Sequence, residues 1–265
     1  MMQQATIHSH AEQLRLAAQN MLTCPPLRES STLQGDDRIQ LAYAIQQHNI
    51  QQQLSQGARI VGRKIGLTSR SVQQQLGVDS PDYGCLFAHM AYADNDEIQI
   101  QNLLQPKIEA EIALVLKQDL THQQHTLADI LSATDYAVAA LEIVDSRIQN
   151  WDISLVDTIA DNASCGLFVL GSQPKPLSEL DLINCNMQLF ENDIPVSHGQ
   201  GKACLGNPLI AACWLADRMV ELGTPLRAGD IVLTGALGPM VPAKAGATYH
   251  AIVEGLGQVC IHFTQ

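Results

Sequence analysis

The sequence lacks any long apolar run, and no stretch approaches the roughly 20 residues that a membrane-spanning helix needs. Its first residues also lack the basic region followed by an apolar region that marks a secretory signal peptide. These two absences argue against a membrane protein and against a secreted one. We therefore expect a cytoplasmic protein.

Positive charge is scarce as well. The 265 residues include 15 Lys and Arg against 27 Asp and Glu, which gives a formal net charge of −12 at pH 7. A nucleic-acid partner needs a basic surface that neutralises phosphates, so this composition argues against one. It does not exclude a small anionic substrate, because a few local cations can capture an anion on an acidic protein.

Common zinc and nucleotide motifs are also missing. The seven cysteines include no CxxC pair, and the nine histidines include no HExxH arrangement. Gly-Gln-Gly-Lys at 199–202 lacks the full spacing of a P-loop. We expect the cysteines to be reduced and mostly buried.

The pattern of apolar residues divides the chain into a helical N-terminal segment, 1–58, and a strand-rich body, 59–265. In the N-terminal segment, Ser9 and Glu12 have the spacing of a capping box and predict the start of one helix. A second helix is predicted from about residue 37 to Gly57, which is a plausible stop.

The body consists of short apolar segments separated by Gly, Asn, Asp or Pro, which is typical of strands. One helix interrupts them, with Asn207 as its predicted N-cap and Pro208 as its first residue. The sequence therefore predicts the α+β fold class. The predicted strands cover 59–67, 108–116, 136–144, 167–170, 187–190, 231–234, 249–253 and 259–263.

Two glutamates are unusual residues on the predicted strand 108–116. Alternate side chains of a strand share a face, so Glu109 and Glu111 point the same way. On a buried face the two carboxylates would repel each other and lose hydration, and a bound divalent cation would remove both penalties. A solvent-exposed face that carries two glutamates is the alternative. The same face continues into Ala113 and Val115, which favours burial.

A third glutamate, Glu142, lies near the end of the apolar strand predicted at 136–144. A lone acid within such a strand needs a partner. Three carboxylates, with water completing the coordination shell, suit Mg²⁺ or Mn²⁺ better than zinc, which prefers His and Cys. The sequence therefore predicts that Glu109, Glu111 and Glu142 bind a hard divalent cation.

Six motifs, in the same order along nearly the whole chain, resemble the hydratase/decarboxylase branch of the fumarylacetoacetate hydrolase superfamily. They lie at 62–68, 77–84, 109–111, 141–147, 161–166 and 229–235. The resemblance implies a β-rich, mixed-sheet body of that family behind the helical segment. It also implies a homo-oligomer, often a pentamer or decamer, and possible association with an aldolase or decarboxylase of the same pathway.

The resemblance further implies a lyase that acts on a small 2-oxo acid. The implied reaction is the hydration of 2-hydroxypenta-2,4-dienoate to 4-hydroxy-2-oxopentanoate in the breakdown of aromatic compounds, with Mg²⁺ or Mn²⁺ held by the three glutamates. The expected alternatives are decarboxylation of 2-oxohex-3-enedioate (4-oxalocrotonate) and hydration of 2-oxohept-4-enedioate. Their second carboxylate calls for an extra cation or set of donors in the pocket, and the sequence alone does not place Arg70 and Lys202 relative to that pocket.

Two other classes fit the residues less well. A non-catalytic partner subunit would have a disabled site, whereas Lys64 and the three glutamates are all retained. A hydrolase that cleaves carbon–carbon bonds of acylpyruvates depends on a water-activating His–Glu pair, and we cannot locate such a pair in the sequence.

Four further residues are site candidates. Lys64 lies in a short apolar strand near glycines, where it would bind the substrate anion or donate a proton. The alternative to this site role is a lysine exposed on the surface. Asp82 is ordinarily a turn residue, but the resemblance places its loop over the site, where it would polarise water or pair with Lys64. Ser164 is expected to bind the substrate carboxylate unless it is only a loop cap, and Thr234 is expected to line the pocket.

Overall fold

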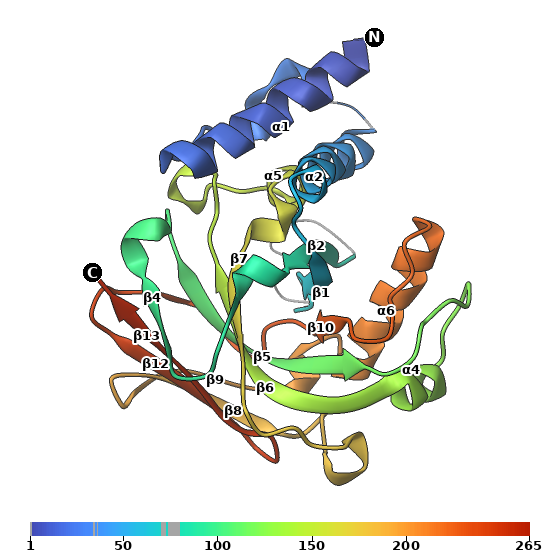
Figure 1. Cartoon of the computed structure of the whole chain (residues 1–265), viewed down its shortest axis with the longest axis vertical. Helices are drawn as coiled ribbons and strands as arrows, with labels where there is room; N and C mark the ends of the chain where they lie inside the picture. The colour runs from blue at the N-terminus through green and yellow to red at the C-terminus, as the bar shows by residue number, and fades with distance from the viewer. Residues whose placement is uncertain (1, 34, 36, 70–72, 74–79) are drawn as a thin grey trace.

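Helices precede a body of two β-sheets in the computed structural model, which describes residues 2–33, 35, 37–69, 73 and 80–265 (Figure 1). The helices are α1 Met2–Asn20, α2 Arg38–Ser55, α4 Leu127–Ala133, α5 Leu155–Ala160 and α6 Pro208–Glu221. The strands are β1 Ile60–Gly66, β2 Asp82–Phe87, β3 Ala91–Tyr92, β4 Asp96–Gln99, β5 Lys107–Leu116, β6 Thr134–Val144, β7 Cys165–Leu170, β8 Asn186–Glu191, β9 Ile194–Gln200, β10 Ile231–Leu233, β11 Val241–Pro242, β12 Thr248–Val253 and β13 Gly257–Thr264.

The larger sheet has the order β2-β1-β10-β5-β6-β7-β3, and β11 pairs with β5. Its long central strands β5 and β6 are antiparallel, whereas β1 and β10 are parallel, so the sheet is mixed. The smaller sheet has the order β4-β13-β12-β8-β9, in which β4 and β13 are parallel. The α+β class with a mixed-sheet body is thereby confirmed.

Strand β5 lies between two apolar cores. One face packs against the smaller sheet, and the other faces β2, β7 and the end of α2. Acidic side chains on β5 therefore have protein on both sides of the strand. Burial of each Leu or Ile side chain in these cores contributes about 1.5–3 kcal/mol to the free energy of folding. The first core includes Ile108, Ile112, Leu189, Tyr249 and Phe263, and the second includes Ala113, Ala140, Phe87, Phe168 and Ile50.

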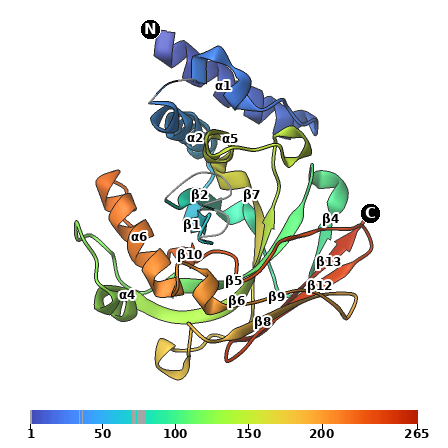
Figure 2. The same ribbon diagram turned by 180° about the vertical axis from the view of Figure 1, so that it is seen from behind.

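The N-terminal helices α1 and α2 lie beside α5 at one end of the body (Figures 1 and 2). They share a third apolar core with the body, in which Leu14 and Ile45 pack with Ile159. The buried Gln46 side chain of α2 donates hydrogen bonds to the carbonyls of Tyr83 and Ile159 at 2.9 and 3.0 Å. These contacts fix α2 over the start of β2.

Most of the predicted elements are confirmed. Asn207 caps α6 by accepting the Leu209 N–H at 3.0 Å, and each predicted strand overlaps an observed one. The predicted start of the first helix at Ser9 is wrong, because α1 begins at Met2; the preceding residues include several good helix formers and no Gly or Pro. No helix in the described ranges is long and apolar enough to cross a membrane.

Candidate metal centre

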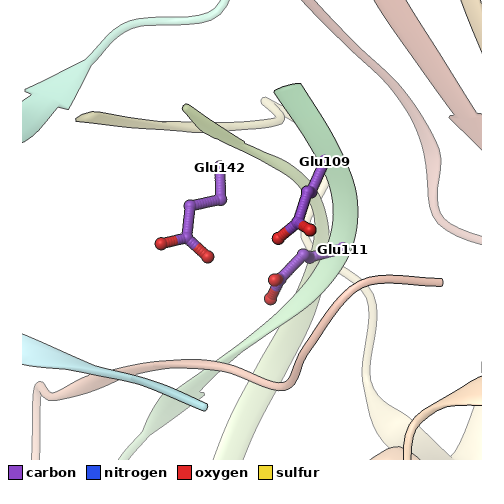
Figure 3. A group of neighbouring side chains, drawn as sticks. All are labelled: Glu109, Glu111 and Glu142. Carbon is purple, nitrogen blue, oxygen red and sulfur yellow. The ribbon is translucent and has the colours of Figure 1, made fainter. Parts of the chain in front are cut away.

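Three glutamate carboxylates converge on one side of the larger sheet (Figure 3). Glu109 on β5 and Glu142 on β6 are direct cross-strand partners, and Glu111 is the next β5 residue on the same face. Each side chain offers one oxygen that lies within 4.8 Å of the others. Glu111 and Glu142 are buried and Glu109 is partly buried, so the alternative of a solvent-exposed strand face is wrong.

Few protein groups neutralise these carboxylates. Glu142 Oε1 forms an ion pair with Lys64 Nζ at 2.8 Å. Glu111 Oε2 accepts the Gly235 N–H at 2.8 Å. In the part of the chain that the structure describes, Glu111 Oε1 and Glu142 Oε2 have no hydrogen-bond partner. Among the described residues, one ion pair therefore offsets three acids in a largely buried site.

The electrostatic cost appears in the pKa values of the site. Burial, with repulsion from Glu142, raises the pKa of Glu109 to about 7. Burial and the two neighbouring carboxylates raise the pKa of Glu111 well above its usual range. Burial opposes the charge of Lys64, but the combined attraction of Glu142 and the other acidic groups nearby outweighs it and raises the pKa of the lysine. In the metal-free protein, protons bound to the glutamates therefore offset part of the negative charge that a cation would neutralise.

The donor set fits a hard divalent cation. All three ligand candidates are carboxylates, which Mg²⁺ and Mn²⁺ prefer, and two of their oxygens lack any partner among the described residues. Within those residues, no other group of three His, Cys, Asp or Glu side chains converges in this way. The predicted hard-cation site thus has the geometry that such a site requires.

Mg²⁺ is expected to raise the melting temperature more at about pH 8 than at about pH 6. A glutamate whose pKa is higher in the folded than in the unfolded protein binds more protons when folded. The metal-free protein therefore loses stability as pH rises from about 4.5 through about 7. The cation replaces those protons, so its binding strengthens over the same interval. Melting curves with and without Mg²⁺ across this pH interval check the expectation, and a pH-independent shift would contradict it.

Lys64 and Asp82 lie on neighbouring strands beside the glutamates. The Lys64 side chain is 4% exposed, so the alternative of an exposed lysine is wrong. Asp82 was expected in a loop, but it is the first residue of β2, buried and paired with Gly66 of β1. The strand forms because β1 supplies backbone partners for 82–87, which the local sequence does not reveal. Burial raises the pKa of Asp82 to about 6, although Lys64 opposes the shift.

Ser164 and Thr234 differ in the hydrogen bonds of their hydroxyls. Ser164 is buried at the end of a short turn, Asn162–Ser164, whose three residues all have positive φ, between 52° and 55°. Such backbone is strained for residues other than glycine and is typical of functional sites. Its hydroxyl has no partner among the described residues. The Thr234 hydroxyl donates to the Ile112 carbonyl at 2.9 Å, so its proton is already used.

A cavity of about 1370 Å³ reaches Glu109. Its walls come from 65–69 at the end of β1 and directly after it, from 236–240 after β10, and from β8, β9 and β12. A mostly apolar cavity that ends at a charged centre is typical of a small-molecule site. Lys202 also lines it, whereas Arg70 lies outside the described residues. The apolar wall includes Ile65, Leu67, Met187, Leu237, Pro239, Met240 and Ile252.

The sequence did not identify one residue that contacts the centre, Gly235. Its amide, rather than a side chain, binds Glu111, and its φ is +109°. The available signal was a glycine directly after a predicted strand, which often marks a bulge or a close backbone approach.

The chain is similar to known proteins over nearly its whole length. Residues 41–264 match the family described as fumarylacetoacetate (FAA) hydrolase C-terminal. The chain is 59% identical over 260 residues to a 2-keto-4-pentenoate hydratase of Burkholderia vietnamiensis and 58% identical over 259 residues to one of Paraburkholderia phymatum, with 98% of both chains covered in each case. The structure resembles 4-oxalocrotonate decarboxylase from Pseudomonas putida G7, complexed with magnesium and adipate, with a TM-score of 0.92, 31% identity and 98% of both chains covered.

Proposed function

This chain belongs to the fumarylacetoacetate hydrolase family, and we propose that it is a hydro-lyase that uses a divalent cation to hydrate 2-hydroxypenta-2,4-dienoate. The product is 4-hydroxy-2-oxopentanoate, and the reaction is a late step in the breakdown of aromatic compounds. The observation that carries the proposal is the convergence of Glu109, Glu111 and Glu142 beside a buried lysine. It occurs in a chain that matches two 2-keto-4-pentenoate hydratases over nearly its full length.

The roles of the side chains follow from their surroundings. The three glutamates would hold Mg²⁺ or Mn²⁺, which would supply a Lewis acid for the negative charge that develops on the substrate's 2-oxygen. Lys64 adds a fixed positive charge at Nζ and a proton that it can donate there. Asp82, whose pKa is raised to about 6, polarises the attacking water.

Ser164 is proposed to bind the substrate, and Thr234 to support the strand that carries two of the metal ligands. Ser164 donates its unpartnered hydroxyl to the substrate carboxylate. Thr234 is not among the residues that line the cavity, and its hydroxyl supports β5 through the Ile112 carbonyl. The apolar cavity wall excludes bulk water from the rest of the substrate.

Decarboxylation of 4-oxalocrotonate is the second candidate. The structural similarity to a 4-oxalocrotonate decarboxylase favours it, as does Lys202, a cation in the cavity wall that suits a second carboxylate. The same cation would suit the hydration of 2-oxohept-4-enedioate. Identity to the two hydratases is 59% and 58%, against 31% to the decarboxylase, and this difference favours the hydratase.

Product analysis by NMR separates these activities. The purified protein with Mg²⁺ is expected to convert 2-hydroxypenta-2,4-dienoate into 4-hydroxy-2-oxopentanoate, and to release little CO₂ from 4-oxalocrotonate. Release of CO₂ from the diacid without hydration of the dienoate would replace the first function by the second. No turnover of either compound would support a non-catalytic partner subunit.

We further propose that the enzyme works in the cytoplasm as a homo-oligomer, a pentamer or decamer, that can associate with an aldolase or decarboxylase of its pathway. All seven cysteines are free thiols in the structure, as suits a reducing compartment. We assign 1–58 to a helical segment and 59–265 to the catalytic domain. Light scattering of the purified protein tests the subunit number.

A further inference from the structure

The backbone that follows β10 forms a bulge next to the metal centre. The amides of Thr234 and Leu237 donate to the two β5 carbonyls that flank Glu111, at 3.1 and 3.0 Å. Between them, the Gly235 amide donates to the Glu111 carboxylate at 2.8 Å rather than to the backbone of β5. A bulge of this kind redirects a polar group, here an N–H, toward a site.

Only glycine fits the bulge at this position. Gly235 has φ +109°, and a Cβ atom there would lie 2.2 Å from Thr68 Oγ1. The Thr68 carbonyl in turn accepts the Leu205 N–H at 3.1 Å. The bulge is therefore packed against the segment after β1 and against the connection between β9 and α6.

The Gly235 carbonyl is bound by a thiol. Cys204 Sγ donates to it at 2.9 Å, and this cysteine is fully buried in the connection between β9 and α6. Burial, with the nearby Glu111 carboxylate, raises the pKa of the thiol, which therefore stays protonated and able to donate. The two polar groups of Gly235 thus have different partners: its amide binds Glu111 and its carbonyl accepts from Cys204.

We propose that Cys204 is a positioning residue of the metal centre, which acts through Gly235 to fix the carboxylate of Glu111. The inference rests on the proposed function, in which Glu111 is a ligand of the cation. The thiol itself touches neither the cation nor the substrate. Without it the buried Gly235 carbonyl has no donor in the part of the chain that the structure describes, and the peptide is free to turn. Glu111 then loses the fixed N–H that orients it.

Binding of Mn²⁺ to the metal-stripped protein, followed by the EPR signal of the free ion, tests the proposal without reference to activity. Cys204→Ala is expected to weaken Mn²⁺ binding by about tenfold, as for loss of other groups that orient a ligand. Cys204→Ser restores a donor and is expected to bind within about threefold of the wild type. Cys204→Val fills the space with a slightly larger apolar side chain that has no donor, and it is expected to behave like Cys204→Ala.

Cys185→Ala is the matched control. Cys185 is also a buried thiol that donates to a backbone carbonyl, that of Leu182 at 3.5 Å, but no contact joins it to the glutamates. It is expected to lower the melting temperature and to leave Mn²⁺ affinity unchanged. Wild-type affinity in both Cys204→Ala and Cys204→Val would overturn the proposal, as would equal weakening in Cys185→Ala. A wild-type protein that binds no Mn²⁺ would instead overturn the metal site itself.

Discussion

Replacing Glu111 with glutamine is expected to reduce Mg²⁺-dependent hydration by about a thousandfold while the protein stays folded. Glutamine has the same shape and keeps an oxygen to accept the Gly235 N–H. The other terminal atom becomes an amide nitrogen, which does not bind Mg²⁺. The variant therefore loses one of three ligands without losing its packing.

The stability of this variant distinguishes a ligand from a structural acid. Burial and two neighbouring carboxylates disfavour the charged form of Glu111. Metal-free Glu111→Gln is therefore expected to melt at or above the temperature of the metal-free wild type, and to gain little from Mg²⁺. Glu97→Gln, on the exposed side of β4, serves as the control and should leave both turnover and the Mg²⁺ effect unchanged. A clear loss of metal-free stability in Glu111→Gln would contradict the ligand role.

Replacing Lys64 with methionine is expected to lower turnover by about 10²–10⁴-fold, the range for loss of a proton-transfer group. It also leaves Glu142 buried without its ion-pair partner. In the metal-free protein, breaking such a pair costs about 3–5 kcal/mol of unfolding free energy. Urea unfolding measured without metal and with Mg²⁺ checks this, and Mg²⁺ should recover part of the loss.

The double variant Lys64→Met/Glu142→Gln is the control for the ion pair. Because it removes both charges, it is expected to be more stable than Lys64→Met alone in the absence of metal. Its turnover should stay as low as that of the single variant. Equal stability of the single and double variants would show that the pair is not the source of the loss.

The acids of the metal centre were predictable because the strand period is a local property. Glu109 and Glu111 share a face in any strand, and apolar neighbours indicated that this face is buried. The sequence also indicated the strand around Glu142. It did not give the register that makes Glu109 and Glu142 direct partners, because pairing depends on the turn geometry and packing of the whole sheet.

Other parts of the site depend on contacts between distant segments. Asp82 was expected in a loop but lies in β2. The strand forms by pairing with β1, a separate segment of the chain, so the residues around Asp82 do not reveal it. The hydrogen bonds of Gly235 join it to Glu111 and Cys204, which are 124 and 31 residues away in the sequence. No local sequence pattern predicts contacts of this kind. Helices α4 and α5, each with an Asp at N3 of a capping box, were missed, since both are short and largely set by packing.

Turnover of 2-hydroxypenta-2,4-dienoate during stepwise addition of Mg²⁺ to the metal-stripped protein tests whether the three converging glutamates hold the cation on which hydration depends. We predict no turnover without metal, and a rate that rises with Mg²⁺ and saturates at one ion per chain. Full turnover in excess chelator would contradict this prediction.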